Sequence, residues 1–454
     1  MNRAFDISFD WLPRDSDNII ERYTLADICI SWGSFCITEL SDEFAKTVRK
    51  GPRVSAYAMA LWFASNWWRL RWEPERNNDI SWLLSHKLGA AGGGYCWPDL
   101  SFASDGEAVT IRSEPTSAEG DVFVRYLQRI DLDIPATEFE AAVDAFIEAV
   151  MNRVVSKTSA ETELVGLWKE VIQERHDPSL TVWRKLEALI GRDPDETPEN
   201  TVESLLNLRR DYGTGAVEEM AAAFKENAGE VMVRLWNESR SMAFPARVVG
   251  SEMLRERIRV AVPPSPVSWR RAVAAASQAR MFWSIKSGPV NDKTLAEILS
   301  LPVSKLEYVK AKSAPVNAGF RERDSVEEMN IFINKTSMAG RRFSLARIIA
   351  DNLITEPDER LLPICDTKTK RQKFQRAFAQ EFLCPFKDLM EYMGNREISD
   401  TAIENAAGHF KVSPLLVRTT LVNNNLLNRD CLGTYPSSWP TRICFADRIE
   451  NNPT

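Results

Sequence analysis

The chain has 454 residues, of which 44% are hydrophobic and 27% charged, a balance typical of globular proteins with several domains. Its formal net charge of −7 argues against a general binder of nucleic acids or membranes. No apolar run reaches the roughly 20 residues that span a bilayer, and the N-terminus lacks an apolar signal core. We therefore expect a cytoplasmic protein without a membrane partner.

Cysteine and histidine are too scattered to predict a metal or redox site. None of the 7 cysteines forms a C-x-x-C pair, which excludes a zinc ribbon and a thioredoxin-like motif, so we expect free and mostly buried thiols. The 3 histidines are isolated, and His86 follows an apolar W-L-L that places it in a core. The sequence therefore predicts no cofactor.

Residues 1–157 are predicted to form a Trp-rich α+β domain of unknown role. A strand is expected over 28–38, and Ser41 followed by two acidic residues predicts a helix start. The segment 56–72 carries four tryptophans, which favour a core over a stacking platform for bases or a ligand. We recognise no enzyme motif in this domain.

The second half of this domain predicts turns, a small sheet and a closing helix. The triple glycine at 92–94 lacks the Lys-Ser or Lys-Thr of a phosphate-binding loop, so a turn is expected there. Alternating segments at 108–112 and 121–127 predict strands, and 138–155 predicts a helix.

Residues 158–262 are predicted to be an acidic helical region. Over 161–230 the chain has 16 Asp and Glu against 8 Lys and Arg, a difference of −8. Such a bias usually marks a solvated helix face, and a docking surface for a basic partner is the alternative. The prolines in 263–266 predict a domain boundary.

Two amphipathic helices, 341–353 and 371–385, are the most informative part of the chain. Leu345, Ile349 and Leu353 form an apolar stripe on the first helix. On the second, phenylalanines at 374, 378 and 382 do the same. Arg347 and Asp351 are four residues apart and share another face of the first helix.

This pair resembles the core of the ImmA/IrrE-type zinc metallopeptidases. In that family the first helix runs R-F-T-L-A-H-E-L-G-H and the second E-x-x-A-N-x-F-A-A-x-L-L-M-P. The matching segments here are Arg342-Phe343-Ser344-Leu345-Ala346, Ala377-Phe378-Ala379 and Cys384-Pro385. The resemblance covers about residues 268–427 and implies a zincin-like domain over 268–395.

The resemblance places unsuitable residues at every position of the peptidase chemistry. The first metal histidine corresponds to Arg347, the catalytic glutamate to Ile348, the second histidine to Asp351 and the glutamate ligand to Gln372. Zinc requires imidazole, thiolate or carboxylate donors, and isoleucine cannot act as a general base. We therefore expect a degenerate site without zinc or catalytic residues, in which a buried Arg347–Asp351 pair takes the place of the metal.

Residues 396–430 resemble a helix-turn-helix module, and 431–454 are expected to be a surface tail. Ser399 caps the first helix of the module, and Ser413 with Pro414 opens the second. Arg418, Thr419 and Asn423 are the candidate nucleic-acid contacts on the second helix. A packing role is favoured over DNA binding.

The sequence predicts an α+β, mostly helical protein that regulates by binding. By resemblance it is a bacterial pseudo-peptidase whose protein partner is a repressor, toxin or regulator in stress, toxin–antitoxin or phage-related systems. Nine Lys and Arg against five Asp and Glu over 341–376, a difference of +4, predict a basic cleft. Its candidate partner contacts are Arg341, Arg342, Arg371 and Arg376.

Three alternatives remain. The first is an active metal-dependent endopeptidase that cleaves a repressor or toxin and uses Asp351, Asp366 or Glu381 as ligands. The second is a DNA-binding regulator that acts through the helix-turn-helix module. The third is an ordinary helical core without any relation to the family.

Overall fold

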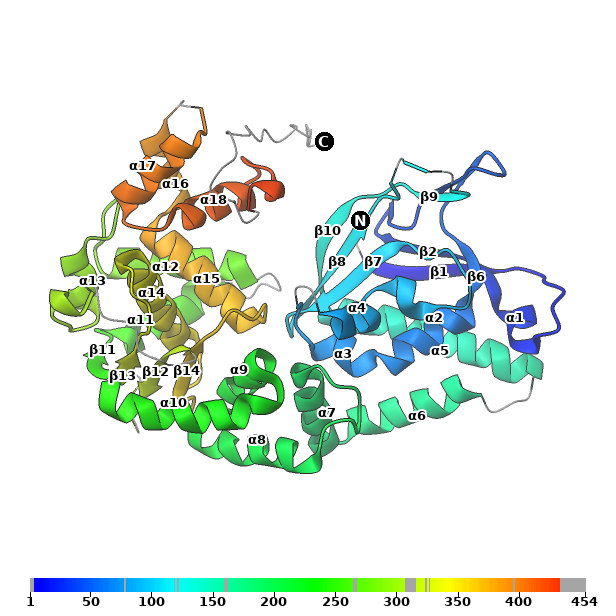
Figure 1. The fold of residues 1–454 in the computed structure, drawn as a ribbon, viewed down its shortest axis with the longest axis horizontal. Helices are drawn as coiled ribbons and strands as arrows, with labels where there is room; N and C mark the ends of the chain where they lie inside the picture. The colour runs from blue at the N-terminus through cyan, green and yellow to red at the C-terminus, as the bar shows by residue number, and fades with distance from the viewer. Residues whose placement is uncertain are drawn as a thin grey trace. The chain divides into compact units, whose positions relative to one another are not determined.

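A computed structural model describes residues 4–432, apart from 77–78, 118, 121, 159–161, 264–267, 307–315, 323–324, 326 and 395–396. The expected mixed α+β class is confirmed, and the chain forms two compact units (Figure 1). Unit 1 comprises Met1–Leu208, Val217–Gly229 and Asp366–Lys370, and unit 2 comprises Arg209–Ala216, Glu230–Cys365 and Arg371–Thr454. The boundaries expected after 157 and near 263–266 fall inside these units.

Unit 1 contains three antiparallel sheets. The first pairs β2 with β1, β3 and β6, the second has the order β5-β4-β9, and the third has the order β10-β8-β7. The strands are β1 (Phe5–Trp11), β2 (Leu25–Trp32), β3 (Phe35–Cys36), β4 (Leu40–Asp42), β5 (Thr47–Arg49), β6 (Arg53–Ser55), β7 (Asp99–Ser104), β8 (Ala108–Glu114), β9 (Val124–Tyr126) and β10 (Ile130–Pro135).

The expected helix start at Ser41 is wrong. Ser41 lies in β4, which pairs with β5 and β9, and the acidic residue after it closes a turn instead. The Asp42 carboxylate accepts a hydrogen bond from the backbone N–H of Ala45 at 2.9 Å. An acidic side chain satisfies a free N–H equally well in a turn and at a helix N-terminus.

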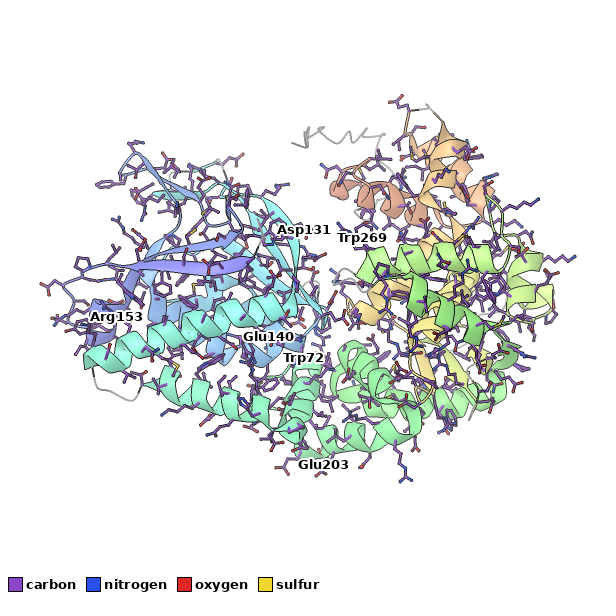
Figure 2. All side chains as sticks on the ribbon, turned by 180° about the vertical axis from the view of Figure 1, so that it is seen from behind. Trp72, Asp131, Glu140, Arg153, Glu203 and Trp269 are labelled. Carbon is purple, nitrogen blue, oxygen red and sulfur yellow. The ribbon has the colours of Figure 1, made fainter. Side chains whose placement is uncertain are left out.

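The helices of unit 1, several of which pack on strands of the first and third sheets, enclose an aromatic core. They are α1 (Ile19–Thr24), α2 (Ala56–Ser65), α3 (Trp67–Trp72), α4 (Ile80–His86), η1 (Leu88–Ala91), α5 (Ala136–Thr158), α6 (Glu163–His176) and α7 (Pro178–Ile190). Glu140 and Arg153 mark the length of α5 in Figure 2. Trp62, Trp67 and Trp68 are buried in this core, as expected.

Three further helices continue the acidic region through both units. They are α8 (Glu199–Tyr212), α9 (Thr214–Phe224) and α10 (Ala228–Met242), with the short η2 (Lys225–Asn227) between the last two.

The glycines at 92–94 form the expected turn, and all three have positive φ angles that residues with a Cβ rarely adopt.

The short segment Asp366–Lys370, which leads into helix α15 (Lys370–Leu383), belongs to unit 1. The Lys368 ammonium lies 2.8 Å from a Glu75 carboxylate oxygen, and Lys370 pairs with Glu107. Thr369 donates a hydrogen bond to Glu219 at 2.8 Å. Three consecutive residues of this stretch thus contact other parts of unit 1.

Unit 2 is built around one antiparallel sheet of order β11-β13-β12-β14. Its strands are β11 (Phe244–Arg247), β12 (Asn317–Arg321), β13 (Glu328–Phe332) and β14 (Leu361–Ile364). The helices are α11 (Ser251–Ala261), α12 (Ser268–Phe282), α13 (Asp292–Ile298), η3 (Val303–Leu306), α14 (Met338–Ile354), α15 (Lys370–Leu383), α16 (Phe386–Met393), α17 (Asp400–Phe410), α18 (Pro414–Asn423) and η4 (Arg429–Leu432).

Ser399 and Ser413 are helix caps in unit 2, as the sequence predicts, and Asn291 caps a third helix. Asn291, Ser399 and Ser413 each accept a hydrogen bond from a backbone N–H in the first turn of α13, α17 and α18. The proline-rich joint beyond Pro263 and the tail after Leu432 lie outside the described residues. In the described part of the chain, no helix is both long and apolar enough to cross a membrane.

Candidate functional site

Helix α14 forms the centre of unit 2. Its side chains from Arg341 to Leu353 are buried except that of Phe343, which is partly buried, so the helix is covered on all sides. It packs against β12, β14 and α11. Gly319 of β12 allows this close approach, because a Cβ at that position would lie 3.2 Å from Ile348 Cγ2. Ile348, the position that the resemblance aligns with a catalytic glutamate, is therefore a core residue.

Arg347 and Gln372 are in direct contact although they come from different helices. Arg347 Nη2 donates one hydrogen bond to Gln372 Oε1 and another to the Cys365 carbonyl, both at 2.6 Å. Gln372 is fully buried, and its Nε2 donates to the Pro363 carbonyl at 3.0 Å. The guanidinium thus lies in a polar pocket of neutral acceptors between α14, α15 and the end of β14.

Asp351 is fully buried and forms a two-point ion pair with Arg371. Both Arg371–Asp351 hydrogen bonds measure 2.7 Å, one from Nε and one from Nη2. Arg371 also lies 3.1 Å from Glu359. Such bidentate geometry holds both side chains in fixed positions.

The Glu359 carboxylate continues this network to the start of α9. It accepts hydrogen bonds from the backbone N–H groups of Gly215 and Ala216 at 2.6 and 2.8 Å. A carboxylate at a helix N-terminus is favoured by the helix dipole. Gly213 is required beside it, because its φ is +99° and a Cβ there would lie 2.7 Å from Glu359 Cδ.

Arg321 caps the other end of α14. From β12 it donates to the Asn352 side chain and carbonyl, both at 2.8 Å, and to Thr355 Oγ1 at 3.0 Å. Burial, with a smaller contribution from Arg255, lowers the pKa of Arg321 to about 10. A cation at a helix C-terminus is favoured by the helix dipole, which offsets part of the cost of burying it.

The expected basic cleft is not an open surface. Arg341 and Arg342 are only 2% and 0% exposed. Arg342 pairs with Asp292 and donates to the Val290 carbonyl at 2.6 Å, and only 11% of the Arg371 side chain is exposed. Arg376 is half-buried on α15. The guanidinium groups of Arg341, Arg342 and Arg371 are therefore buried or paired inside unit 2 and do not line an open surface.

The other carboxylates considered as metal ligands have different roles. Glu381 accepts a hydrogen bond from the Phe386 N–H at the start of α16, and burial raises its pKa. Asp366 is exposed. Among the described residues, no group of three or more His, Cys, Asp or Glu side chains is placed to hold a metal ion.

The candidate nucleic-acid contacts on α18 are partly engaged within the module. Arg418 Nη2 donates to Asp400 of α17 at 2.8 Å. The Thr419 hydroxyl donates to the Leu415 carbonyl at 2.8 Å, and Asn423 is exposed. The arginine charge that would face a phosphate is thus paired with a carboxylate.

Unit 1 contains a second buried polar cluster, centred on Glu73. Arg69 Nε and Arg76 Nε donate to this carboxylate at 2.8 and 3.0 Å, and His86 Nε2 lies 3.1 Å from it. His86 is fully buried and also contacts the Phe102 carbonyl at 2.8 Å, as expected for a core histidine. Burial raises the pKa of Glu73, but His86 and Arg69 outweigh this and hold it below its ordinary value.

No family model, curated protein or solved structure matches this chain.

Proposed function

We propose that unit 2 is a metallopeptidase-like core of the ImmA/IrrE type that has lost its reaction and acts by binding a protein partner in regulation. The order of elements supports this proposal. Helices α12 and α13 come first, then β12 and β13, then α14, which carries Arg347. Helix α15 follows with Gln372, and the helix-turn-helix-like pair α17 and α18 comes last.

The observation that carries the proposal is the contact between Arg347 and Gln372. The resemblance assigns these two positions to a histidine and a glutamate that bind the same metal ion, so they must lie side by side. They do so at 2.6 Å, across 25 residues of sequence. An arginine at this position repels a metal ion and cannot deprotonate to become a ligand.

A protein partner is favoured by a surface of α11 and α12. Arg257 Nε donates to Gln278 Oε1 at 2.9 Å, which brings the outer faces of the two helices together. Met253 and Met281, one turn from these residues, are 66% and 54% exposed. Trp269 at the start of α12 (Figure 2) is 49% exposed. Methionine, arginine and tryptophan are enriched in protein interfaces.

Metal analysis tests the loss of the reaction. The full chain, purified without added metal, is expected to contain far less than one zinc per molecule. The measurement is elemental mass spectrometry after gel filtration. Stoichiometric zinc that disappears in an Asp351→Asn or Glu381→Gln variant would overturn the proposal in favour of an active endopeptidase.

Restoring the ligands tests the alignment. The variant Arg347→His, Gln372→Glu keeps Asp351 and supplies three donors, so we expect one zinc per chain, removable by a chelator. Its matched control is Gln372→Glu alone. The fuller variant with Asp351→His and Ile348→Glu adds the remaining peptidase residues. If either variant keeps its circular dichroism spectrum and takes up no zinc, the family resemblance fails.

The partner surface has a separate test. A protein that co-purifies with the native chain should bind the variant Met253→Glu, Met281→Glu at least about tenfold more weakly, a loss of about 1.4 kcal/mol. Val303→Glu, at another exposed apolar residue, is the control. Unchanged affinity of the double variant would exclude this surface.

A further inference from the structure

Two cysteines that are separate in sequence meet on one sheet of unit 1. Cys29 lies on β2 and Cys36 on β3, and their Sγ atoms are 3.2 Å apart. Gly33, with a φ of +61°, lies in the turn that reverses the chain between them. The pairing of Ser31 with Cys36 places both thiols on the same side of the sheet.

That side of the sheet is polar rather than part of the core. Ala26, Ile28 and Ile30 of β2 are buried in the hydrophobic core, whereas Asp27, Cys29 and Ser31 alternate with them and are only half-buried. Cys36 is also half-buried. A free cysteine is usually buried as a small apolar residue. Cys29 and Cys36 are instead half-buried on a polar face, and this position makes their thiols accessible to a small reagent.

We propose that Cys29 and Cys36 are a dithiol site that low-molecular-weight disulfides of the glutathione type oxidise to an internal disulfide. In the first step the Cys36 thiolate attacks one sulfur of the reagent. The reagent's S–S bond breaks, one thiol leaves with a proton, and a mixed disulfide forms on Cys36. The Cys29 thiolate then attacks Cys36 Sγ, and the second reagent thiol leaves with the other proton. Two protein thiols are oxidised and one reagent disulfide is reduced.

The surroundings suit Cys36 to the first step. A hydrogen bond from the Cys29 thiol, with smaller contributions from Thr38, lowers the pKa of Cys36 to about 7. The same bond raises the pKa of Cys29. The Lys50 carbonyl, 2.9 Å from Cys36 Sγ, acts in the opposite sense because it accepts a hydrogen bond from the neutral Cys36 thiol. The dithiol site is therefore defined by the short sulfur separation and the half-buried polar face, and the lowered pKa of Cys36 is a supporting feature.

The second step needs little movement. A disulfide has an S–S distance of about 2.05 Å, so the two sulfurs must approach each other by only about 1.2 Å. Strand β3 has only two residues, and a turn follows it at once. The other described cysteines offer a contrast: Cys96 is exposed, and Cys365, Cys384 and Cys431 are buried.

The experiment uses the full-length reduced protein and glutathione disulfide. After incubation, remaining thiols are alkylated and the protein is digested with trypsin. Both cysteines lie on one tryptic peptide, 23–46, and Cys96 lies on another, 88–112. We expect peptide 23–46 to lose two hydrogen atoms, to carry no alkyl group and to recover both thiols on reduction. If both thiols are alkylated, or glutathione stays on Cys36, the proposal is overturned.

Variants separate the two steps. Cys29→Ser should trap glutathione on Cys36, because the second thiol is missing, and Cys96→Ser should leave the internal disulfide unchanged. The pH dependence of Cys36 alkylation should have its midpoint near 7 in the wild-type protein. In Cys29→Ala, which has no hydrogen-bond donor at this position, the midpoint should rise toward the ordinary value of about 8.5. Rapid internal disulfide formation with an unshifted midpoint would still support the site and would show that the lowered pKa of Cys36 is not needed for the first step.

Discussion

Both units bury charged side chains, but the cluster of unit 1 is built around a single carboxylate, whereas unit 2 holds two buried arginines with neutral groups beside its Asp351–Arg371 ion pair. In unit 1 the Glu73 carboxylate is the centre, and it is surrounded by the basic side chains of Arg69, Arg76 and His86. In unit 2 Arg347 bonds to the neutral Gln372 amide and a backbone carbonyl, and Arg321 likewise donates to neutral groups.

The difference indicates what each cluster contributes. When a carboxylate held by several donors is neutralised, all of those buried donors lose their compensating charge at once. An arginine held by amide and carbonyl groups loses ordinary hydrogen bonds instead, which are weaker. We therefore expect unit 1 to depend on its central charge more strongly than unit 2 depends on Arg347.

The largest expected effect is that of Glu73→Gln. Removing this buried negative charge leaves Arg69 without its closest carboxylate, and breaking such a pair costs about 3–5 kcal/mol. Urea unfolding followed by tryptophan fluorescence measures the loss, because Trp67 and Trp68 lie in the core of unit 1. Asp99→Asn, which disturbs an exposed pair with Lys87, is the control and should change stability by no more than about 0.5 kcal/mol.

The same variant has a pH signature. The pKa of Glu73 is lower in the folded protein than its ordinary value of about 4.3 in the unfolded chain. The stabilisation that the ionised Glu73 contributes is therefore complete above the unfolded-chain pKa of about 4.3, and it is lost as the pH falls through the folded pKa. The stability difference between wild type and Glu73→Gln should shrink below about pH 4. A difference that stays constant down to pH 3 would contradict the charge argument.

An intermediate effect is expected for Arg347→Met. It removes two hydrogen bonds from buried acceptors and should cost about 1–3 kcal/mol. Combined with Gln372→Leu it should cost less than the two single changes added together, with a coupling of about 0.5–3 kcal/mol. The exposed Lys293→Met is the control. Additive losses would mean that the two residues do not act as a pair.

The smallest effect is expected for Arg418→Ala. Its partner Asp400 is 41% exposed, and solvent screening limits such a pair to about 0.2–1 kcal/mol. Thermal unfolding measures this loss. A gel-shift titration at two salt concentrations, with DNA and both proteins, gives a second measurement. Salt-dependent binding by wild type that the variant lacks would revive the DNA-binding alternative.

Local sequence patterns were sufficient for the helices and their caps, because these depend on neighbours a few residues away. The stripes of α14 and α15 were predicted to within three residues at every end. The basic cleft was predicted wrongly, because charge counting does not reveal burial. The partners of Arg341 and Arg342, the Lys305 carbonyl and Asp292, lie 36 and 50 residues away.

The cysteine pair was missed for the same kind of reason. A single strand over 28–38 would separate Cys29 from Cys36 by roughly 23 Å, at about 3.3 Å per residue. The turn at Gly33 folds that segment in two and leaves 3.2 Å between the sulfurs. The glycine was a visible signal, since a hairpin turn often needs a positive φ. The burial on both sides of α14 had no comparable local signal.

Residues 366–370 give the protein an order of assembly during translation. Unit 1 includes this late segment, whose lysines pair with Glu75 and Glu107. The ribosome must therefore synthesise most of unit 2 before unit 1 receives its last residues, although N-terminal domains generally fold first. A gene fragment that ends at residue 208 would therefore encode unit 1 without Val217–Gly229 and Asp366–Lys370.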